Sequence, residues 1–417
     1  SFVKEKKPSP VAPSKNQTLI DVKGFKITGM TIVTEAEAQA VLAPFNNRKL
    51  TLAQINEAAS AISDLYQTKG RIAQAVVPPQ EIKDGMVEIK VIEGRIGAII
   101  IEPAFAEDPP RLKSEVITNF MAYSNPVGGL VDLNGLERSL SLISEIPGVR
   151  AEGSLEPGKD DGATDIRVKV DELSRFSGRV DLSNFGSAST GSEQAILSLG
   201  LNDLMGVGDA GTIDVIGSAG SVFAQARYFV PGSYDGLRVG IGGSTLSYKT
   251  LTSFSPITGS GTASVGGVYA NYALERSSRA NKTFNLSLEQ KSYFNYNGGL
   301  EASNYTIKSA TLGVLGNQFV GNASWVWLVN AVFGDLAINN TSQLENDQSG
   351  AATAGSYAKV LINSTFNQPL PLKKTNALFS FNGQWANKNL NSAEQLYLGG
   401  PYLSLIHISE PTRQAEI

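Results

Sequence analysis

The feature that most constrains this chain is an alternation of apolar and polar residues that fills most of its second half. Between Leu173 and Leu390 about eleven such runs follow one another, separated by turn-like clusters such as "PGSYDG" and "ERSSRANK". In the run "TFNLSLEQ", for example, Phe284, Leu286 and Leu288 fall on one side of an extended strand and polar residues on the other. This period of two predicts β-strands, and no convincing helix is expected before Leu390.

The two sides of these strands differ in a way that favours a membrane barrel over a soluble β-sandwich such as a secreted adhesin. The strands are long, and the apolar side is expected to carry aromatic residues near strand ends, as in the girdles of membrane barrels: Tyr228, Tyr248, Trp325 and Trp327. The other side is polar or glycine rather than aliphatic, which suits a water-filled interior. Because no segment approaches ~20 consecutive apolar residues, no transmembrane helix is expected.

The first 172 residues follow a different pattern. Residues 1–22, rich in Lys, Pro and Ser, are predicted to form an extended linker. Residues 23–95 then predict the element order β-α-α-β-β, and residues 96–172 repeat that order less clearly. Because a repeated supersecondary pattern is poorly explained by chance, we expect two similar α+β units in tandem before the all-β region begins at residue 173.

One strand of the first unit is expected to lie at the edge of a small sheet. A helix over "TLAQINEAASAISDLYQTKG", with Thr51 as its N-cap and Gly70 as its stop, is followed by the strand "RIAQAVVPPQ". Pro78 and Pro79 end this strand abruptly. Exposed edges are either blunted or used to bind an extended peptide by strand addition. From the residues alone, a merely solvated edge is an equally good interpretation.

Composition excludes much active-site chemistry. The chain has no cysteine, and its single histidine, His407, lies close to its end. Residues 1–402 therefore cannot form a His-dependent triad, a Cys nucleophile, or a zinc or haem site built on Cys and His. We predict no enzyme activity, no cofactor and no metal. A net charge of -4 gives no general basic surface, so nucleic acid is not an expected partner.

Two further patterns are better explained by structure than by chemistry. "GVGDAG", which begins at Gly206, matches the dinucleotide fingerprint, but that site needs a helix after the turn. A strand-like segment follows here, so a hairpin turn is predicted. The carboxylate pairs Asp160–Asp161 and Glu35–Glu37 lack an apolar setting that would shift a pKa, which favours solvated surface over acid–base work.

Several longer stretches resemble the two-partner secretion transporters (TpsB proteins), outer-membrane exporters that include haemolysin activators and the filamentous haemagglutinin exporter. "YQTKGRIAQAVVPPQEIKDGMVEIKVIEGRI" resembles the first polypeptide-transport-associated (POTRA) domain of that family, and "LERSLSLISEIPGVRAEGSLEPGKDDGATDIRVKV" resembles the second. "LNDLMGVGD" resembles a hairpin between early barrel strands. The last stretch, "LGGPY", is similar to the segment that precedes the family's lumenal arginine motif and consists of Leu398, Gly399, Gly400, Pro401 and Tyr402.

The resemblance implies a domain order. It implies POTRA domain 1 at residues 23–95, POTRA domain 2 at residues 96–172 and a partial outer-membrane β-barrel at residues 173–402. About eleven of the roughly sixteen strands of such a barrel are expected in this chain. The stretch Leu403–Arg413 resembles one reading frame of a transposon-derived sequencing adapter. Residues 403–417 are therefore expected to be an artefact, and the chain a C-terminally truncated fragment.

The resemblance also implies a function. It implies a bacterial outer-membrane translocator whose periplasmic POTRA domains recognise the N-terminal secretion domain of an unfolded exoprotein, and whose barrel forms the conduit. Outer-membrane lipid and the barrel-assembly machinery are the other expected partners. The alternative is a barrel-assembly insertase of the same superfamily, which usually carries more than two POTRA domains. The expected cargo-binding residues lie on the edge strand and adjacent helix of POTRA domain 1: Arg71, Ile72, Ala73, Gln74, Ala75, Val76, Val77, Leu52, Ile55 and Ile62.

Overall fold

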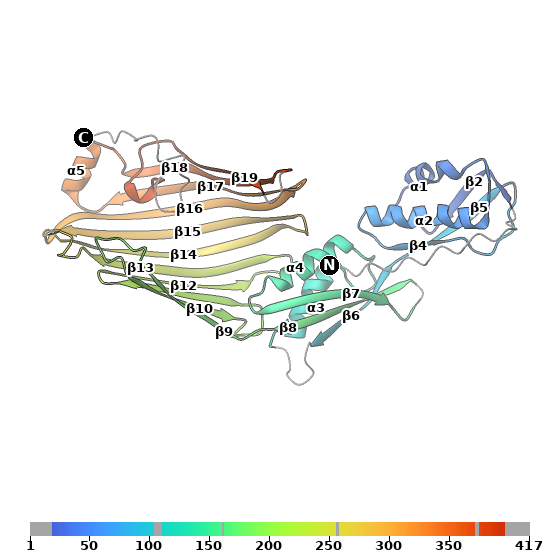
Figure 1. The fold of residues 1–417 in the computed structure, drawn as a ribbon, viewed down its shortest axis with the longest axis horizontal. Helices are drawn as coiled ribbons and strands as arrows, with labels where there is room; N and C mark the ends of the chain where they lie inside the picture. The colour runs from blue at the N-terminus through green and yellow to red at the C-terminus, as the bar shows by residue number, and fades with distance from the viewer. Residues whose placement is uncertain (1–18, 104–110, 161, 256–257, 372–374, 397–417) are drawn as a thin grey trace.

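The computed structural model describes residues 19–103, 111–160, 162–255, 258–371 and 375–396. Most of the expected linker, the loop Leu398–Tyr402 and the expected adapter-derived tail Leu403–Ile417 lie outside these residues. Figure 1 shows two small α+β units followed by a large curved sheet, in the order of the sequence. The predicted change from α+β to all-β structure is confirmed.

The first unit, residues 20–94, contains a small three-stranded sheet covered by two helices. Its elements are β1 (Ile20–Val22), β2 (Gly24–Thr28), α1 (Glu35–Leu42), the short 3-10 helix η1 (Ala43–Phe45), β3 (Arg48–Leu50), α2 (Leu52–Thr68), β4 (Ala73–Val76) and β5 (Met86–Glu93). The strand order is β2-β5-β4, with β2 parallel and β4 antiparallel to β5, and β1 pairs with β3. The linker was predicted to reach residue 22, but the folded unit already begins at β1, where Val22 is fully buried in the core.

Helix α2 forms where the sequence predicts it. Thr51 and Gln54 make a capping box, in which each side chain accepts the backbone N–H of the other residue. The helix ends before Gly70, whose φ of 69° is a left-handed conformation that favours glycine. Its buried residues recur at helical spacing and face the sheet: Ile55, Ala58, Ala59, Ile62 and Tyr66.

The second unit, residues 95–172, repeats this order. Its elements are β6 (Arg95–Pro103), α3 (Ser114–Ser124), α4 (Leu133–Ser144), β7 (Val149–Pro157) and β8 (Ala163–Glu172). The strand order β6-β8-β7 corresponds to β2-β5-β4, again with one parallel and one antiparallel pair. The unit has a core of its own, in which Ile117, Leu136 and Ile166 are each 0% exposed.

The repeat extends to a carboxylate at the end of each unit. Glu93, the last residue of β5, accepts the backbone N–H of Thr31 (2.7 Å) and that of the next residue (3.1 Å). Glu172, the last residue of β8, accepts the N–H of Arg111 (2.8 Å) and that of the next residue (2.8 Å). In both units a glutamate therefore fixes the segment just before the first helix.

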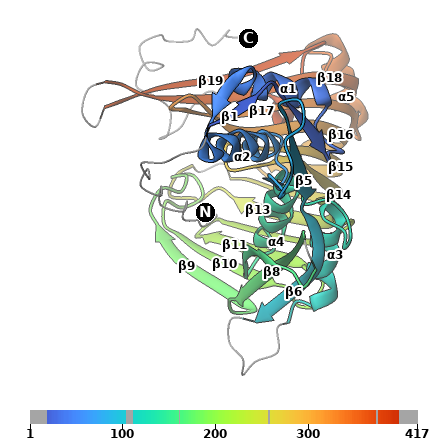
Figure 2. The same cartoon turned by 90° about the vertical axis from the view of Figure 1, so that its right-hand side faces the viewer.

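In the rest of the described chain, eleven strands form one antiparallel sheet. They are β9 (Phe176–Ser183), β10 (Gln194–Asn202), β11 (Ala210–Ser218), β12 (Ser221–Pro231), β13 (Leu237–Lys249), β14 (Gly259–Arg276), β15 (Ala280–Asn297), β16 (Leu300–Val320), β17 (Ala323–Ile338), β18 (Gly355–Pro369) and β19 (Asn376–Ala386). Each strand pairs with its neighbour in sequence, so β9 and β19 form the two edges. Figure 2 shows that the sheet curls into an open arc, with the two edge strands on the same side. The predicted number of alternating runs is confirmed.

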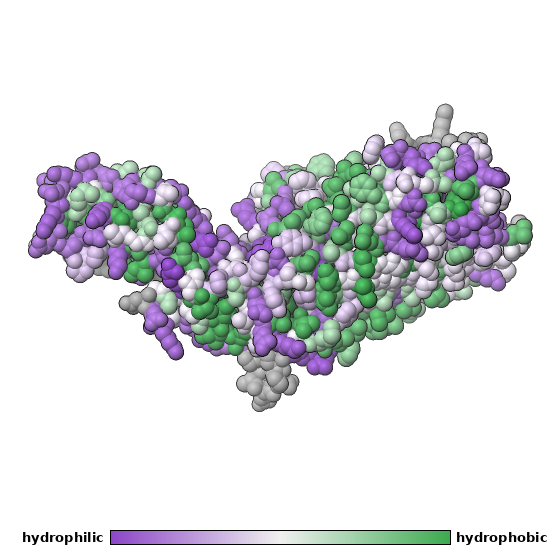
Figure 3. Space-filling model, turned by 180° about the vertical axis from the view of Figure 1, so that it is seen from behind, coloured by the Kyte–Doolittle hydropathy of each residue, from purple (hydrophilic) through white to green (hydrophobic). Residues whose placement is uncertain are grey.

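The outer face of this sheet is apolar. Ile241, Val268 and Leu288 are register partners on β13, β14 and β15, and they are 64%, 49% and 48% exposed. Figure 3, which views the convex side, shows apolar side chains spread over the outside of the sheet. Among the described residues, no helix has the length and apolar character to cross a membrane.

Two expectations about this region are wrong. Tyr248 does not share the apolar side, because it lies an odd number of residues after Ile241 and therefore points to the opposite face. Its hydroxyl contacts Asn295 there (2.9 Å). A helix, α5 (Thr341–Ser349), also lies in the region expected to contain none. Apart from Leu344 it is polar, and it starts at an Asn340 cap, so neither the alternation nor a helical apolar stripe reveals it.

The turn predicted at "GVGDAG" is confirmed. Gly206 and Gly208 lie in the connection between β10 and β11, with φ values of 72° and 85°. The strand β11 follows at once, so the helix that a dinucleotide site requires is replaced by a strand.

Candidate functional site

The predicted edge strand does lie at the edge of a sheet. β4 pairs with β5 on one side only, and α2 packs beside it (Figure 1). The strand comprises Ala73–Val76, so Arg71 and Ile72 come before it and Val77 follows it. The edge is short, and the Pro78–Pro79 pair stops it from growing because proline has no N–H to donate.

The backbone groups on the free side of β4 can be identified. The carbonyl of Ile72 accepts the N–H of Gly94 (2.9 Å), so the backbone groups of Ile72 point towards the β5 side. Because backbone groups alternate in direction along an antiparallel strand, those of Ala73 and Ala75 point away from β5. In agreement with this, the N–H of Ala75 donates to Ser63 Oγ on α2 (3.0 Å). The backbone groups of Ala73 and Ala75 therefore point to the unpaired side of β4, where Ser63 already holds the N–H of Ala75.

The three residues of α2 that were predicted to bind cargo do not lie at the free edge of β4. Ile55 and Ile62 are 1% and 0% exposed, because they pack into the core between α2 and the sheet. A buried side chain cannot contact an added strand, so we remove both from the predicted binding surface. Leu52 is 60% exposed. It lies eleven residues before Ser63, which at the helical rise is roughly 16 Å along the axis, so it is remote from the middle of β4.

Arg71 belongs to the joint between the two units rather than to the free edge. Its guanidinium forms an ion pair with Asp132 (3.4 Å), the N-cap residue of α4. Gly94 is the single residue between β5 and β6, and its carbonyl accepts the N–H of Val131 (3.0 Å). These contacts link the end of the first unit to the loop before α4.

Gly70 completes this joint. Its carbonyl accepts the N–H of Leu133, the first residue of α4 (2.8 Å). Its φ is 69°, and a Cβ at this position would lie 2.5 Å from Nδ2 of Asn134. A side chain at Gly70 is therefore unfavourable both because of the backbone conformation and because Asn134 of α4 lies close.

Beside the joint, Glu93 holds the first unit together. It accepts hydrogen bonds from the hydroxyls of Tyr66 (2.7 Å) and Thr31 (2.5 Å), in addition to the backbone groups described above. Burial alone would raise the pKa of Glu93, but these hydrogen bonds outweigh burial and lower it. The pKa of Tyr66 is raised, mainly by burial and then by its bond to Glu93. This cluster fixes the loop before α1 against α2.

A second carboxylate links the two helices of the first unit. Lys69 Nζ lies 2.7 Å from Glu37 Oε1, which joins the end of α2 to the start of α1. The hydrogen bond from Lys69, together with those from Thr34, lowers the pKa of Glu37 to about 2. Glu35 is exposed and Glu37 is partly exposed, and the pKa of Glu37 is shifted by polar partners rather than by an apolar setting. This fits a polar helix face better than an acid–base pair.

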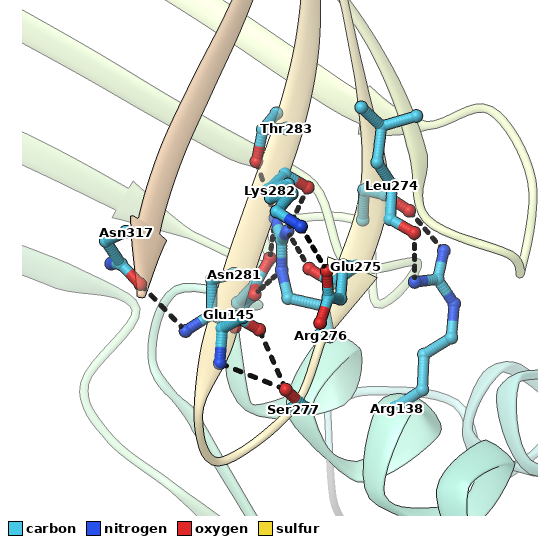
Figure 4. A network of polar contacts seen from close by, with 12 residues as sticks. Arg138, Glu145, Leu274, Glu275, Arg276, Ser277, Asn281, Lys282, Thr283 and Asn317 are labelled. Atoms are coloured by element: carbon cyan, nitrogen blue, oxygen red, sulfur yellow. Dashed lines mark hydrogen bonds and ion pairs between the residues drawn. The ribbon is translucent and has the colours of Figure 1, made fainter. Parts of the chain in front are cut away.

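The second unit docks on the turns at one end of the large sheet, and α4 carries the contact. Arg138 Nη2 donates to the carbonyls of Asp235 (2.7 Å) and Ala273. Its Nη1 donates to the carbonyl of Leu274 (3.4 Å), as Figure 4 shows. Because a guanidinium presents several donors in one plane, this side chain holds the β12–β13 turn and the end of β14 at once.

A second contact lies at the C-terminal end of α4, about two helical turns after Arg138. Arg276, at the end of β14, donates to both carboxylate oxygens of Glu145 (Figure 4), with 3.2 Å between Nη2 and Oε2. The side chain of Arg276 is only 9% exposed. Glu137 accepts the backbone N–H of Ser278 (2.6 Å) in the turn that follows. Two glutamates, one on each side of Arg138 in sequence, therefore hold this region. Glu145 holds the end of β14, and Glu137 holds the turn that follows it.

The β10–β11 turn, residues 203–209, contacts the second unit as well. The carbonyl of Gly206 accepts the N–H of Lys113, just before α3 (3.1 Å). Asp203 and Asp209 in this turn are both fully buried. Burial raises the pKa of Asp203. Burial acts on Asp209 in the same direction, but hydrogen bonds from Tyr228 and from backbone N–H groups outweigh it and lower the pKa of Asp209.

On the inner face, an ion cluster holds the segment that follows β19. Glu394, which is 4% exposed, lies 2.6 Å from Lys359 Nζ on β18 and 3.0 Å from Lys291 Nζ on β15. Gln384 on β19 donates to the carbonyl of Glu394 (2.8 Å). Leu390 packs into an apolar cluster on the same face. Residues 387–396 therefore fold back over the inner face of the sheet.

Sequence reasoning missed the docking residues and this ion cluster. A charged residue on an exposed helical face, such as Arg138, has the same sequence context whether it faces water or a carbonyl group. One signal was available for the cluster, since Lys359 is the only charged residue in β18. A lone charge on the polar side of a long strand indicates a partner on that side.

Two protein-family models match the chain. Residues 162–403 match the model described as "Haemolysin secretion/activation protein ShlB/FhaC/HecB". Residues 20–94 match the model described as "POTRA domain, ShlB-type". Together these matches include the first unit, with its edge strand, and the whole large sheet.

Curated relatives and solved structures are also similar. The heme/hemopexin transporter protein HuxB of Haemophilus influenzae (strain 86-028NP) is 26% identical over 380 residues, which cover 88% of this chain and 65% of HuxB. The outer membrane transporter CdiB of Dickeya dadantii is 24% identical over 402 residues, which cover 91% of this chain and 67% of CdiB. The structure of CdiB from Escherichia coli matches with a TM-score of 0.73 at 20% identity, over 94% of this chain and 73% of that one, which shows a shared fold.

The extent of these matches settles the family. The chain spans 65% of the length of HuxB, so it corresponds to about two thirds of such a protein. The first family model covers residues 162–403, more than half of this chain. The chain therefore belongs to the family of haemolysin secretion/activation proteins ShlB/FhaC/HecB.

Proposed function

We propose that this chain forms the greater part of a bacterial outer-membrane transporter that exports an exoprotein by two-partner secretion. Family membership supports this, as do the names of its relatives, a heme/hemopexin transporter and an outer membrane transporter. The apolar outer face suits contact with lipid, and the polar inner face suits a conduit. The same match favours export over the insertase alternative, and it favours transport over an enzyme activity.

The arrangement of the parts supports an orientation. The first unit matches a POTRA model, and the second repeats its element order, so we propose that residues 96–172 form a second POTRA domain. Because α4 docks on the turns after β12 and β14, these turns and both units would lie in the periplasm. The opposite end of the sheet, with α5, would face the outside. We further propose that barrel-assembly machinery inserts the sheet into the membrane.

We propose that the exoprotein is recognised as an extended, unfolded strand that pairs with the free edge of β4. The observation that carries this proposal is that the outward backbone of Ala73 and Ala75 belongs neither to the joint nor to the docked surface. Figure 1 shows the first unit standing apart from the sheet, which leaves room beside β4. Main-chain pairing suits a cargo whose sequence varies along its length.

The experiment removes one outward donor. Ala73→Pro deletes an N–H that faces the cargo and not β5, whereas Ala73→Ser keeps it. We expect the full chain in detergent to lose about fivefold to tenfold in affinity for the N-terminal secretion segment of the exoprotein with proline, and little with serine. Amide exchange in β5 checks that the proline variant stays folded. Equal affinity for the two variants would rule out pairing at this edge.

A further inference from the structure

The free edge of β4 is partly covered by a single side chain. Ser63 Oγ, from the middle of α2, accepts the N–H of Ala75 at 3.0 Å. Its neighbours Ile62 and Tyr66 face the core, so Ser63 lies on the flank of the helix that overhangs the edge. Ser60, one turn earlier, bonds back to its own helix through the carbonyl of Asn56 (3.0 Å). Ser63 bonds across to the sheet instead.

The second unit has the same feature. Ser144 of α4 contacts Ala151 of β7, the strand that corresponds to β4. Its Oγ accepts the N–H of Ala151 (3.2 Å) and donates to the carbonyl of Ala151 (3.3 Å). Ala75 and Ala151 are each the third residue of their strand. A serine from the second helix therefore satisfies the same position of the edge strand in both units.

The serine contacts of the two units differ in the number of hydrogen bonds. Ser144 engages both backbone groups of Ala151, and its neighbour Glu145 is fixed by Arg276 of the large sheet. Ser63 engages only the N–H of Ala75, so the carbonyl of that residue is not used by the serine. A rotation about χ1 of Ser63 frees the N–H without moving α2.

We propose that Ser63 is a removable cap on the cargo-binding edge. In the free protein it satisfies the central outward donor of β4, and on binding a carbonyl of the cargo strand replaces its hydroxyl. Such a cap protects an exposed edge from pairing with unintended strands, which is a known liability of edge strands. This inference rests on the proposed function, because it takes β4 as the edge that the exoprotein uses.

The cap explains how one fold supplies both a closed and an open edge. An unsatisfied N–H at a partly covered edge is unfavourable, so some partner is needed whenever cargo is absent. A hydroxyl is a suitable partner because it both holds the donor and leaves by rotation. By the same reasoning the doubly bonded Ser144 keeps the β7 edge closed, which directs the cargo to β4.

The test compares Ser63→Ala, Ser63→Thr and Ser144→Ala in the full chain in detergent. Amide exchange in the absence of cargo should become faster at Ala75 in Ser63→Ala only, and at Ala151 in Ser144→Ala only. The probe for binding is the purified N-terminal secretion segment of the exoprotein. Because the cargo no longer competes with a hydroxyl, Ser63→Ala should bind about fivefold more tightly, roughly the worth of one hydrogen bond. Ser63→Thr and Ser144→Ala should bind as the unaltered chain does.

Each alternative result has a distinct meaning. Unchanged exchange at Ala75 in Ser63→Ala would overturn the cap itself. Faster exchange with equal or weaker binding would overturn the displacement, while binding at β4 could stand. Failure of every variant and of the unaltered chain to bind the segment would instead overturn the proposed function, and the cargo part of this inference with it.

Discussion

The two α+β units have one topology and two different roles. In the second unit, α4 places Arg138 and Glu145 on the turns of the large sheet. In the first unit, the corresponding helix α2 turns Asn56, Glu57 and Asp64 to solvent. Figure 1 shows the result, a second unit in contact with the sheet and a first unit held away from it. We call the second unit, residues 95–172, the base and the first unit, residues 20–94, the arm.

The difference shows which features follow from the fold and which from its surroundings. The contacts of Glu93 and Ser63 in the first unit are repeated by Glu172 and Ser144 in the second. In each unit the glutamate fixes the segment before the first helix, and the serine bonds to the backbone of an edge strand. The docking residues are not repeated, because only one unit lies against the sheet. The two units therefore differ in the residues on the outer faces of α2 and α4, whereas their cores are built in the same way.

The largest expected effect comes from undocking the base. Arg138→Ala removes the donors to three carbonyl groups, two at the end of β14 and one in the β12–β13 turn, which leaves those carbonyls without a charged partner. We expect a loss of roughly 2–4 kcal/mol in the docked contact, with faster amide exchange in residues 232–236. The control is Glu57→Ala on the solvent side of α2. Equal exchange in the two variants would show that α4 does not hold the second unit in place.

A smaller effect is expected at the joint between arm and base. Gly70→Ala places a Cβ close to Asn134 at a left-handed backbone, which costs roughly 1–2 kcal/mol for the backbone alone. Gly128→Ala is the matched control, because its φ is 81° and nothing lies within 4 Å of the added Cβ. Thermal unfolding should show a larger loss for Gly70→Ala. Small-angle scattering should show a changed angle between the units for that variant only.

The next prediction concerns the carboxylate inside the arm. The folded state lowers the pKa of Glu93, so its stabilisation is present above the unfolded value near 4.5 and is lost as pH falls through the folded value. Glu93→Gln should therefore destabilise the first unit at pH 7, by about 1 kcal/mol, and should flatten its stability below pH 4.5. Urea unfolding at pH 7 and pH 4, followed by amide exchange in α2 and β5, measures both. An unchanged pH profile would contradict this role.

The smallest effect is expected at the surface pair of α1 and α2. Glu37 has a pKa of about 2, held down by Lys69, so the contribution of this pair fades as pH falls from about 4.5 towards 2. Glu37→Gln should lower the melting temperature of the first unit slightly at pH 7 and not at pH 2. High salt should reduce the difference, because exposed ion pairs are screened. A large effect at pH 7 would mean that the pair is part of a wider network.

Period and capping account for most of what the sequence predicted correctly. The alternation from residue 173 onward predicted the large sheet, because one face meets an apolar and the other a polar medium. Thr51 and Gly70 gave the ends of α2 because caps act over three or four residues. Tyr248 was misplaced because the alternation was followed by residue type and not counted through the two glycines at positions 242 and 243.

The contacts that assign a role to each unit could not be predicted in this way. Arg138 and Ala273 are 135 residues apart, and only the docked geometry brings them together. Ile55 and Ile62 were expected on the binding surface because a helix beside an edge was taken to face it, but the apolar face of α2 points into the core. Ser63 has no sequence signature, since its partner is a backbone N–H on another element.

The most direct test of the comparison asks which edge the exoprotein touches. Gln74 and Arg150 are each the second residue of an edge strand, β4 and β7, and both are exposed. Because the chain has no cysteine, Gln74→Cys and Arg150→Cys each introduce a single thiol. Disulfide cross-linking to an exoprotein segment with one cysteine at successive positions then reports contact. We predict adducts at position 74, alternating along the cargo as an added strand requires, and none at position 150. Adducts at position 150 instead, or an equal yield at both, would contradict the assignment of the first unit as the cargo-binding arm.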